Sequence, residues 1–190
     1  MAAEDPRVER TRRAALEGAL DELAEHGYGA FTIEGVARRA GVGKATIYRH
    51  WDGKLDLLQE AIATLKQQSE RPFGADLRAN VLAKVQAVAE TVASTRFGAC
   101  MPAIIDASER DVAVREFHHR TSADRRASMV ALLQTACDAG HLDDSVDVGI
   151  LGEMMVGPIM LRRLMTDAPY TAEEVDRLVA TVLDPYWRDV

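Results

Sequence analysis

The segment from Thr32 to Lys54, TIEGVARRAGVGKATIYRHWDGK, constrains the fold most strongly, because its pattern predicts two short helices joined by a tight turn. Apolar residues of the first helix recur at helical spacing, namely Ile33, Val36, Ala37 and Ala40. Gly41 follows them, where a helix end favours a residue in the left-handed conformation. The second helix, from Lys44 to about Trp51, is too short to be stable alone, so we expect tertiary packing to hold it.

The second helix has an apolar side and a polar side. At about 100° per residue, Ile47 and Trp51 form a buried stripe. The other sides carry Ala45, Thr46 and Arg49, flanked by Lys44, Tyr48 and His50. A small, polar and cationic face suits a helix that enters the DNA major groove, as in a helix-turn-helix. The alternative is an αα-hairpin inside an ordinary bundle; a glycine-containing turn alone leaves it equally open, and the outward cationic set favours DNA recognition.

The same segment resembles the DNA-binding segment of tetracycline-repressor (TetR) family regulators, in which a helix precedes a G-V-x-K-x-T-[IL]-Y-x-H-[FW]-x-x-K run. The matching residues are Gly41, Val42, Lys44, Thr46, Ile47, Tyr48, His50, Trp51 and Lys54. Two places depart from the family pattern: Gly43 stands where serine is common, and Asp52-Gly53 where Pro-Ser is usual. Asp52 is therefore a candidate cap for the following helix.

From this pattern we predict which side chains contact DNA. Arg49, Lys44 and Thr46 are expected to reach base edges. Phosphate contacts are expected from Tyr48, His50, Lys54 and the capping Thr32, the last through its hydroxyl or the amides of the helix end. The predicted DNA-binding set is thus Thr32, Lys44, Ala45, Thr46, Tyr48, Arg49, His50 and Lys54. Four arginines near the start, Arg7, Arg10, Arg12 and Arg13, are either a solvated helix end or further contacts to phosphates or the minor groove.

The distribution of charge is compatible with DNA binding, although the whole chain carries a net charge of −7. Residues 32–54 contain five basic and two acidic side chains, a local charge of +3. Because salt screens charges beyond about 8–10 Å, binding follows this local patch.

Several classes of protein are not expected. No apolar run approaches the roughly 20 residues of a membrane helix, and the first residues lack the apolar core of a secretory signal. Cys100 and Cys137 are too few for a disulfide framework, so we expect a soluble protein of the cytoplasm. P-loop, GxGxxG, GxSxG and HExxH motifs are absent, which argues against an enzyme. His118 and His119 diverge by about 100° on a helix, so no metal site or cofactor is predicted.

The rest of the chain also reads as helical, which predicts an all-α fold of about nine helices. Helices are expected from Asp5-Pro6 to a stop at His26–Gly29, from Lys54, over 77–95, in a short segment beginning at Pro102, over 111–140 and 146–165, and from a capping box at 171–174. We assign residues 1–54 to a three-helix DNA-binding domain. Residues 55–190 are assigned to a helical domain for effector binding and dimerisation.

The helix predicted over 146–165 is apolar nearly all round, which is typical of a helix buried on every side. We therefore expect the last two helices to pair with their copies across a two-fold axis as a four-helix bundle. A fully intramolecular core is the alternative. The TetR resemblance also implies a dimer built by the last two long helices.

The resemblance further implies a small-molecule effector that weakens DNA binding. Candidate pocket residues are Met101, Ile105, Met129, Leu133, Met154, Met155 and Pro158, since methionine suits adaptable apolar pockets. The ordinary role of any single methionine is to fill a core, and this is the alternative for each of them. Arg162-Arg163 is interpreted either as a site for an anionic ligand or as part of an ion pair at the subunit seam.

The function predicted from these features is that of a homodimeric repressor, bound to a pseudo-palindromic operator and released by an effector. A transcriptional activator or an architectural DNA-binding protein is the alternative. A third reading is an enzyme or carrier with a vestigial DNA domain.

Overall fold

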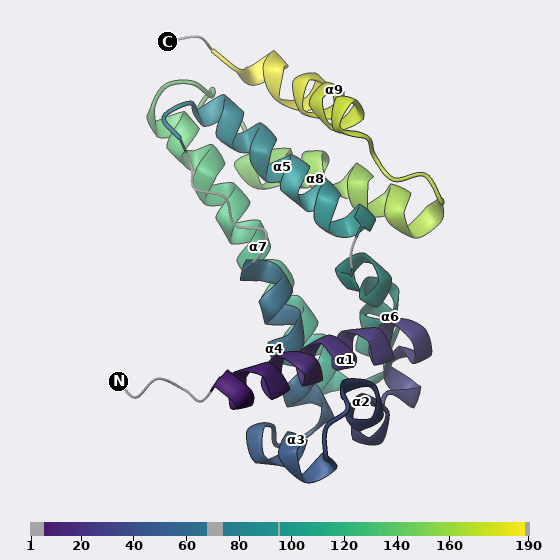
Figure 1. Cartoon of the computed structure of the whole chain (residues 1–190). Helices are drawn as coiled ribbons and strands as arrows, with labels where there is room; N and C mark the ends of the chain where they lie inside the picture. The colour runs from purple at the N-terminus through teal and green to yellow at the C-terminus, as the bar shows by residue number, and fades with distance from the viewer. Residues whose placement is uncertain (1–5, 68–73, 95, 189–190) are drawn as a thin grey trace. The chain divides into compact units, whose positions relative to one another are not determined.

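The computed structural model describes residues 6–67, 74–94 and 96–188, and over these residues it is all-helical, as predicted (Figure 1). In chain order the α-helices are α1 (Pro6–Ala30), α2 (Ile33–Ala40), α3 (Lys44–His50), α4 (Lys54–Gln67), α5 (Leu77–Ser94), α6 (Arg96–Arg110), α7 (Val112–Asp138), α8 (Val148–Met165) and α9 (Ala172–Leu183). A short 3₁₀ helix, η1 (Asp184–Tyr186), follows. The predicted cap Asp5 lies outside the described residues.

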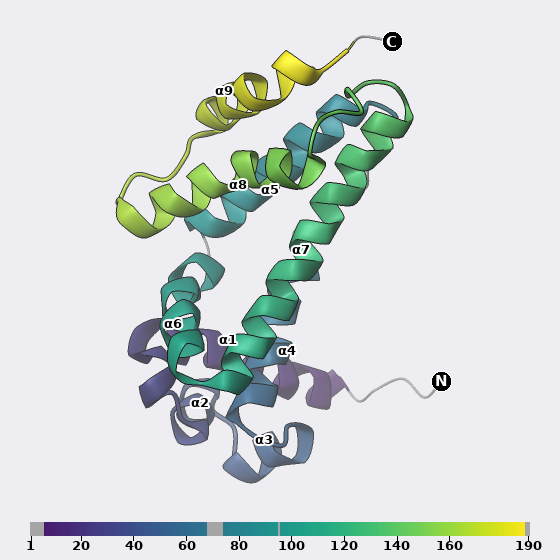
Figure 2. The ribbon, with the colours of Figure 1, turned by 180° about the vertical axis from the view of Figure 1, so that it is seen from behind.

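The chain forms two compact units. Unit 1 comprises Met1–Gln68 and Ala99–His118, and unit 2 comprises Ser69–Gly98 and His119–Val190. Both α6 and α7 contain residues of the two units, so the chain passes between the units inside helices (Figure 2). The functional boundary expected at residues 54/55 stays a prediction.

The core of unit 1 is built on α1, which packs against α2 and α4. Its buried apolar residues from α1 to α4 and from the α1–α2 connection include Ala15, Leu16, Ala19, Leu20, Leu23, Phe31, Val36, Ile47, Leu57, Leu58, Ala61 and Ile62. Helix α1 runs on to Ala30, but its helical backbone is interrupted within the predicted stop, at Gly27, whose φ is 69° and ψ 169°.

In unit 2, α8 packs against α5 and α9. One side of α8 is buried, through Leu151, Gly152, Met155 and Ile159. The capping box predicted at the start of α9 is confirmed, because Thr171 accepts from the Glu174 amide and the Glu174 carboxylate accepts from the Thr171 amide. Among the described residues, none of the helices combines the length and apolar character that a membrane crossing needs.

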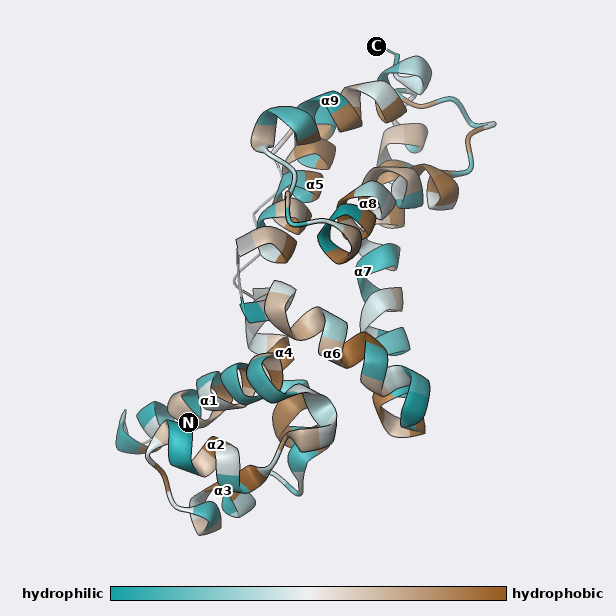
Figure 3. Cartoon of the chain, turned by 90° about the vertical axis from the view of Figure 1, so that its right-hand side faces the viewer, coloured by the Kyte–Doolittle hydropathy of each residue, from teal (hydrophilic) through white to brown (hydrophobic). Residues whose placement is uncertain are grey.

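One expectation for the second half of the chain was wrong. Pro102 does not begin a helix but lies inside α6, which starts six residues earlier at Arg96. Among the described residues, one apolar side of α8 is left uncovered, since Ile150, Leu161 and Met165 are exposed. Figure 3 shows this apolar character as brown segments along α8.

A buried carboxylate joins α1 to α2. Glu22 on α1 is 2 % exposed, and the Nε of Arg39 on α2 lies 2.5 Å from its Oε2. The absence of a side chain at Gly35 makes room for this carboxylate, since a Cβ atom there would lie 1.8 Å from Oε1 of Glu22 and the carboxylate would have to move. The ion pair therefore depends on the close approach of two helices.

We expect Gly35→Ala to lower the free energy of unfolding by about 2–4 kcal/mol, because the new methyl group displaces a buried, ion-paired carboxylate. Thermal or urea unfolding measures the change. Gly29→Ala is the matched control, since nothing lies within 4 Å of a Cβ atom at position 29. Equal stability of the two variants would contradict the role given to Gly35.

Candidate nucleic-acid interface

The turn between α2 and α3 has the geometry that the sequence predicted. Thr32 caps α2, with its Oγ1 accepting from the Gly35 amide at 3.0 Å. Gly41 ends α2 in the left-handed conformation, with φ 65° and ψ 30°. The Val42 amide then donates to the Ala37 carbonyl at 3.0 Å. These bonds satisfy one free amide at the start of α2 and one free carbonyl at its end, and they set the direction in which α3 leaves.

The inner side of α3 is held by packing and by one polar contact. Ile47 is 0 % and Trp51 3 % exposed, which confirms the predicted stripe. The indole Nε1 of Trp51 donates to Oε2 of Glu60 on α4 at 2.9 Å. Arg12 on α1 pairs with the other Glu60 oxygen at 2.7 Å. Helices α1 and α4 therefore both orient α3. The helix ends one residue earlier than predicted, because Trp51 is extended.

The outer side of α3 is exposed and carries the residues predicted to contact DNA. Lys44, Ala45, Tyr48, Arg49 and His50 are exposed, and Thr46 is half-buried. The Arg49 Nη2 donates to Oγ1 of Thr46 at 2.9 Å, so these two polar groups lie side by side on the surface. An arginine with part of its fork already oriented has less side-chain entropy to lose on binding.

An acidic residue without a predicted role contacts the start of α3. Glu34, in the first turn of α2, forms an exposed ion pair with the ammonium of Lys44. The hydrogen bond from Lys44 is the main cause that lowers the pKa of Glu34, with smaller contributions from backbone hydrogen bonding and from the lysine charge. Glu34 and Lys44 are ten residues apart and meet only because the turn folds α3 back on α2. Periodicity along one helix could not have indicated the contact.

Lys54 and Thr32, both predicted phosphate contacts, also have structural roles. The Lys54 ammonium lies 4.1 Å from the centroid of the Tyr28 ring and donates to the Tyr28 carbonyl at 3.4 Å. The Tyr28 ring stacks on Phe31, with 6.4 Å between centroids. Burial, helped by the charge of Asp111, raises the pKa of the Tyr28 hydroxyl. The contacts with Tyr28 thus hold the half-buried Lys54 side chain in one position at the surface.

One smaller expectation is revised. At the start of α4, the carboxylate of Asp56, rather than that of Asp52, makes the capping contact, since it accepts from the Asp52 amide at 3.1 Å. Arg12 is engaged with Glu60 and serves the packing of unit 1. Arg10 and Arg13 are exposed.

The seven residues predicted for an effector pocket do not share one environment. Met101 and Ile105 belong to unit 1, and the other five to unit 2. Met129, Leu133 and Met155 are buried in the core of unit 2, while Met154 is 48 % exposed and Pro158 half-buried.

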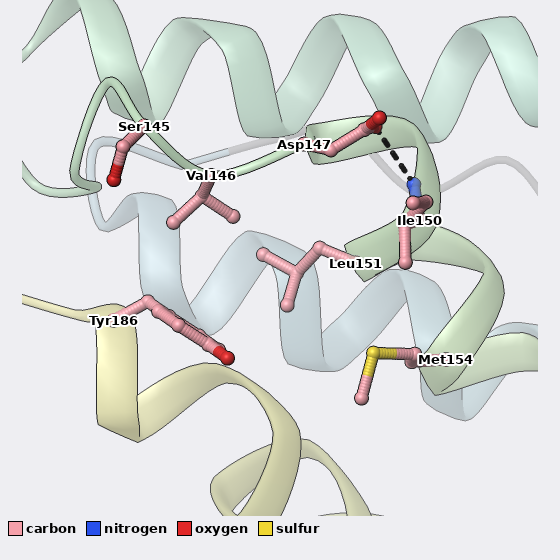
Figure 4. Close-up of a pocket in the computed structure, with 7 residues that line it drawn as sticks. All are labelled: Ser145, Val146, Asp147, Ile150, Leu151, Met154 and Tyr186. Atoms are coloured by element: carbon pink, nitrogen blue, oxygen red, sulfur yellow. Dashed lines mark hydrogen bonds between the residues drawn. The ribbon is translucent and has the colours of Figure 1, made fainter.

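Unit 2 has a small open hollow of about 230 Å³, to which Met154 contributes (Figure 4). It is lined by Ser145, Val146, Asp147, Ile150, Leu151, Met154 and Tyr186. The Asp147 carboxylate there accepts from the Gly149 and Ile150 amides and so caps α8. Within the described residues, no three His, Cys, Asp or Glu side chains gather closely enough to hold a metal ion.

The two arginines near the end of α8 have partners in their own chain. Arg162 pairs with Glu174 at 2.9 Å and stacks over the Tyr170 ring at 3.5 Å. Arg163 donates to the carbonyls of Val92 and Gly98. The ion pair of Arg162 thus forms between α8 and α9 of one chain, and an ion pair at the subunit seam stays a prediction.

Comparison with protein-family models gives two matches. Residues 15–61 match the model described as bacterial regulatory proteins, tetR family, which spans α2 and α3. Residues 72–182, more than half of the chain, match the model described as tetracyclin repressor-like, C-terminal domain.

Individual proteins give the same result. The chain is 30 % identical over 186 residues to a DNA-binding transcriptional repressor TetR of Mycobacteroides abscessus, covering 91 % of this chain and 92 % of the relative. It is 29 % identical over 163 residues to the uncharacterised HTH-type transcriptional regulator YdeS of Bacillus subtilis, covering 85 % and 82 % of the two chains. The crystal structure of the TetR family transcription regulator SCO0332 matches with a TM-score of 0.70 and 29 % identity, over 92 % of this chain and 97 % of that one.

Proposed function

This chain belongs to the TetR family of helix-turn-helix transcriptional regulators, and from that premise we propose that it is a repressor that binds a pseudo-palindromic operator as a homodimer. A small-molecule effector releases it, and it acts in the cytoplasm with the DNA. The observation that carries the proposal is the outer side of α3, where exposed Lys44, Tyr48 and Arg49 stand opposite the buried Ile47 and Trp51.

Base contacts are assigned to the residues near the start and middle of α3. The guanidinium of Arg49 suits the O6 and N7 acceptors of a guanine, and Thr46 beside it contributes a hydroxyl or a methyl contact to a neighbouring base. Ala45 has only a methyl group, so it lets the helix backbone approach the groove. Lys44 reaches a base edge after it leaves Glu34.

Phosphate contacts are assigned to Thr32, Tyr48, His50 and Lys54. The Thr32 oxygen accepts from the Gly35 amide, which leaves the hydroxyl proton free to be donated to a phosphate. The amides at the start of α2 point the same way, and the helix dipole favours an anion there. Such contacts position the protein on the duplex but do not read sequence.

The exposed side of α8 supports the dimer. Exposed apolar residues recur along one stripe of this helix, namely Ile150, Met154, Leu161, Leu164 and Met165, with exposed fractions of 57 %, 48 %, 61 %, 40 % and 73 %. Gly157 lies in the same stripe, and nothing is found within 4 Å of a Cβ atom there, so a second helix can approach closely. We propose that α8, with α9, pairs with its copy as a four-helix bundle.

The effector site is proposed for unit 2, near the hollow that Ile150 and Met154 line. These two side chains also belong to the exposed stripe of α8, so a ligand there would contact residues of the dimer seam.

Transcriptional activation is the second candidate function, because an activator would use the same α3 surface. Transcript levels measured with and without the effector separate the two functions. Operator binding that is sensitive to the effector and lowers transcript levels indicates repression.

Arg49→Ala is expected to weaken operator binding by about 1–3 kcal/mol and to relax sequence preference, whereas Lys54→Ala weakens operator and random duplex alike. Fluorescence anisotropy on both duplexes, at a temperature at which every variant is folded, measures this. Equal losses of Arg49→Ala on the two duplexes would remove Arg49 from the base-reading set.

Glu34→Gln is expected to tighten binding to operator and random duplex by about two- to fivefold, because DNA no longer has to break the exposed Glu34–Lys44 pair. The gain should be lost in a Lys44→Gln background. Asp52→Asn is the matched control, since it removes a negative charge from the same segment without releasing Lys44. A gain from Glu34→Gln that persists without Lys44 would refute competition for the lysine.

Leu161→Glu is expected to convert the dimer into a monomer at micromolar concentration, because it places a charge in the apolar seam. Sedimentation should give twice the 20.8-kDa chain mass for the unsubstituted protein and the single mass for the variant. Ala24→Glu, on the exposed side of α1, controls for an added charge. A monomeric unsubstituted chain would refute the dimer.

A further inference from the structure

Helix α6 contains a backbone carbonyl that its own helix cannot satisfy. Pro102 lies inside α6 and has no N–H group. In an α-helix that N–H would donate to the carbonyl four residues earlier, which is the carbonyl of Gly98. A carbonyl left without a donor away from water destabilises the fold by an amount comparable to a lost hydrogen bond.

Arg163 of α8 supplies the missing donor. Its Nη2 donates to the Gly98 carbonyl at 2.6 Å, and its Nε donates to the Val92 carbonyl at 3.2 Å. Val92 lies in the last turn of α5, where helix carbonyls also lack an internal partner. One planar guanidinium thus satisfies one unpaired carbonyl of α5 and one of α6.

The geometry of the junction explains why glycine stands at position 98. A Cβ atom there would lie 2.1 Å from the Val92 oxygen and 3.4 Å from Nε of Arg163. Only a residue without a side chain lets the end of α5 and the start of α6 approach closely enough to share one guanidinium. A lysine ammonium is a point charge and lacks the fixed fork that matches two carbonyls.

We propose that Arg163 is a positioning residue for DNA binding, which holds the first turn of α6 against α5 and α8 by replacing the N–H that Pro102 lacks. Helix α6 continues from Gly98 into unit 1, the unit that contains α3. The contact therefore connects α8, the helix assigned to the dimer seam, to the helix that enters the DNA-binding unit. The coupling to DNA rests on the function proposed above, whereas the replacement of the N–H does not.

The first test is a rescue experiment read by hydrogen–deuterium exchange over residues 96–106. Arg163→Ala is expected to speed exchange there by about tenfold, because two charge-assisted hydrogen bonds are lost. Adding Pro102→Ala should restore slow exchange, since the new N–H can donate to Gly98. Pro102 is exposed, so alanine introduces no clash. Unchanged exchange in Arg163→Ala, or a double variant that exchanges as fast as Arg163→Ala, would overturn the proposal.

The second test measures binding to the duplex that the chain selects from a random library. Arg163→Ala should weaken binding by about fivefold, in the range found for residues that carry coupling between sites, and the double variant should recover it. Arg162→Ala is the matched control, because it removes the neighbouring arginine and its bond to Glu174 but leaves Gly98 paired.

The two readouts separate the possible failures. Fast exchange in Arg163→Ala with unchanged DNA affinity would refute the coupling while keeping the structural contact. A chain that selects no duplex would refute the proposed function and the coupling with it, and the exchange rates would still decide whether Arg163 replaces the N–H of Pro102. A loss in Arg162→Ala equal to that in Arg163→Ala would also refute a specific role for Arg163.

Discussion

Burial of Ile47 and Trp51 is the interaction on which the proposed DNA-binding surface depends. Helix α3 has seven residues, too few to be stable in water without tertiary contacts. Its place is set by two apolar side chains that are almost completely buried, and by the Trp51 indole, which donates to Glu60. Because Glu60 on α4 also pairs with Arg12 on α1, contacts from both helices hold α3 in one orientation. Once the inner side is set, helical periodicity decides that Thr46 and Arg49 face outward.

Local patterns in the sequence were sufficient for most of the helices. The apolar spacing in α2, the left-handed Gly41 and the capping box at Thr171 each depend on residues within one or two turns, and each was predicted correctly. Pro102 was misread because the usual rule treats proline as a helix start. Inside α6, the missing N–H of Pro102 leaves the Gly98 carbonyl without its helical donor, and this carbonyl accepts from Arg163 instead. Because Arg163 lies far along the chain, no local pattern could indicate the contact.

In the candidate site, too, the features that depend on local sequence were predicted and those that depend on contacts between elements were not. The outer residues of α3 follow from the helical period, but the Glu34–Lys44 pair forms across a turn and was missed. The effector residues could not be predicted as a set, because a methionine in an apolar stripe serves equally to fill a core or to line a cavity. The structure places Met129 and Met155 in the core and leaves Met154 half exposed beside a small hollow. Similarly, the all-round apolar character of α8 reflects one side buried within the chain and one side that the described residues leave uncovered.

Selection of bound sequences from a random duplex library tests the central claim most directly. If the outer side of α3 reads DNA and α8 pairs the chains, the enriched sequences contain an inverted repeat with half-sites about one helical turn apart, or a multiple of it. With Arg49→Ala the preference should relax and the enrichment weaken, while weak, salt-sensitive binding remains. Enrichment of no sequence, or equally strong enrichment of the same sequence by the Arg49→Ala variant, would contradict the account.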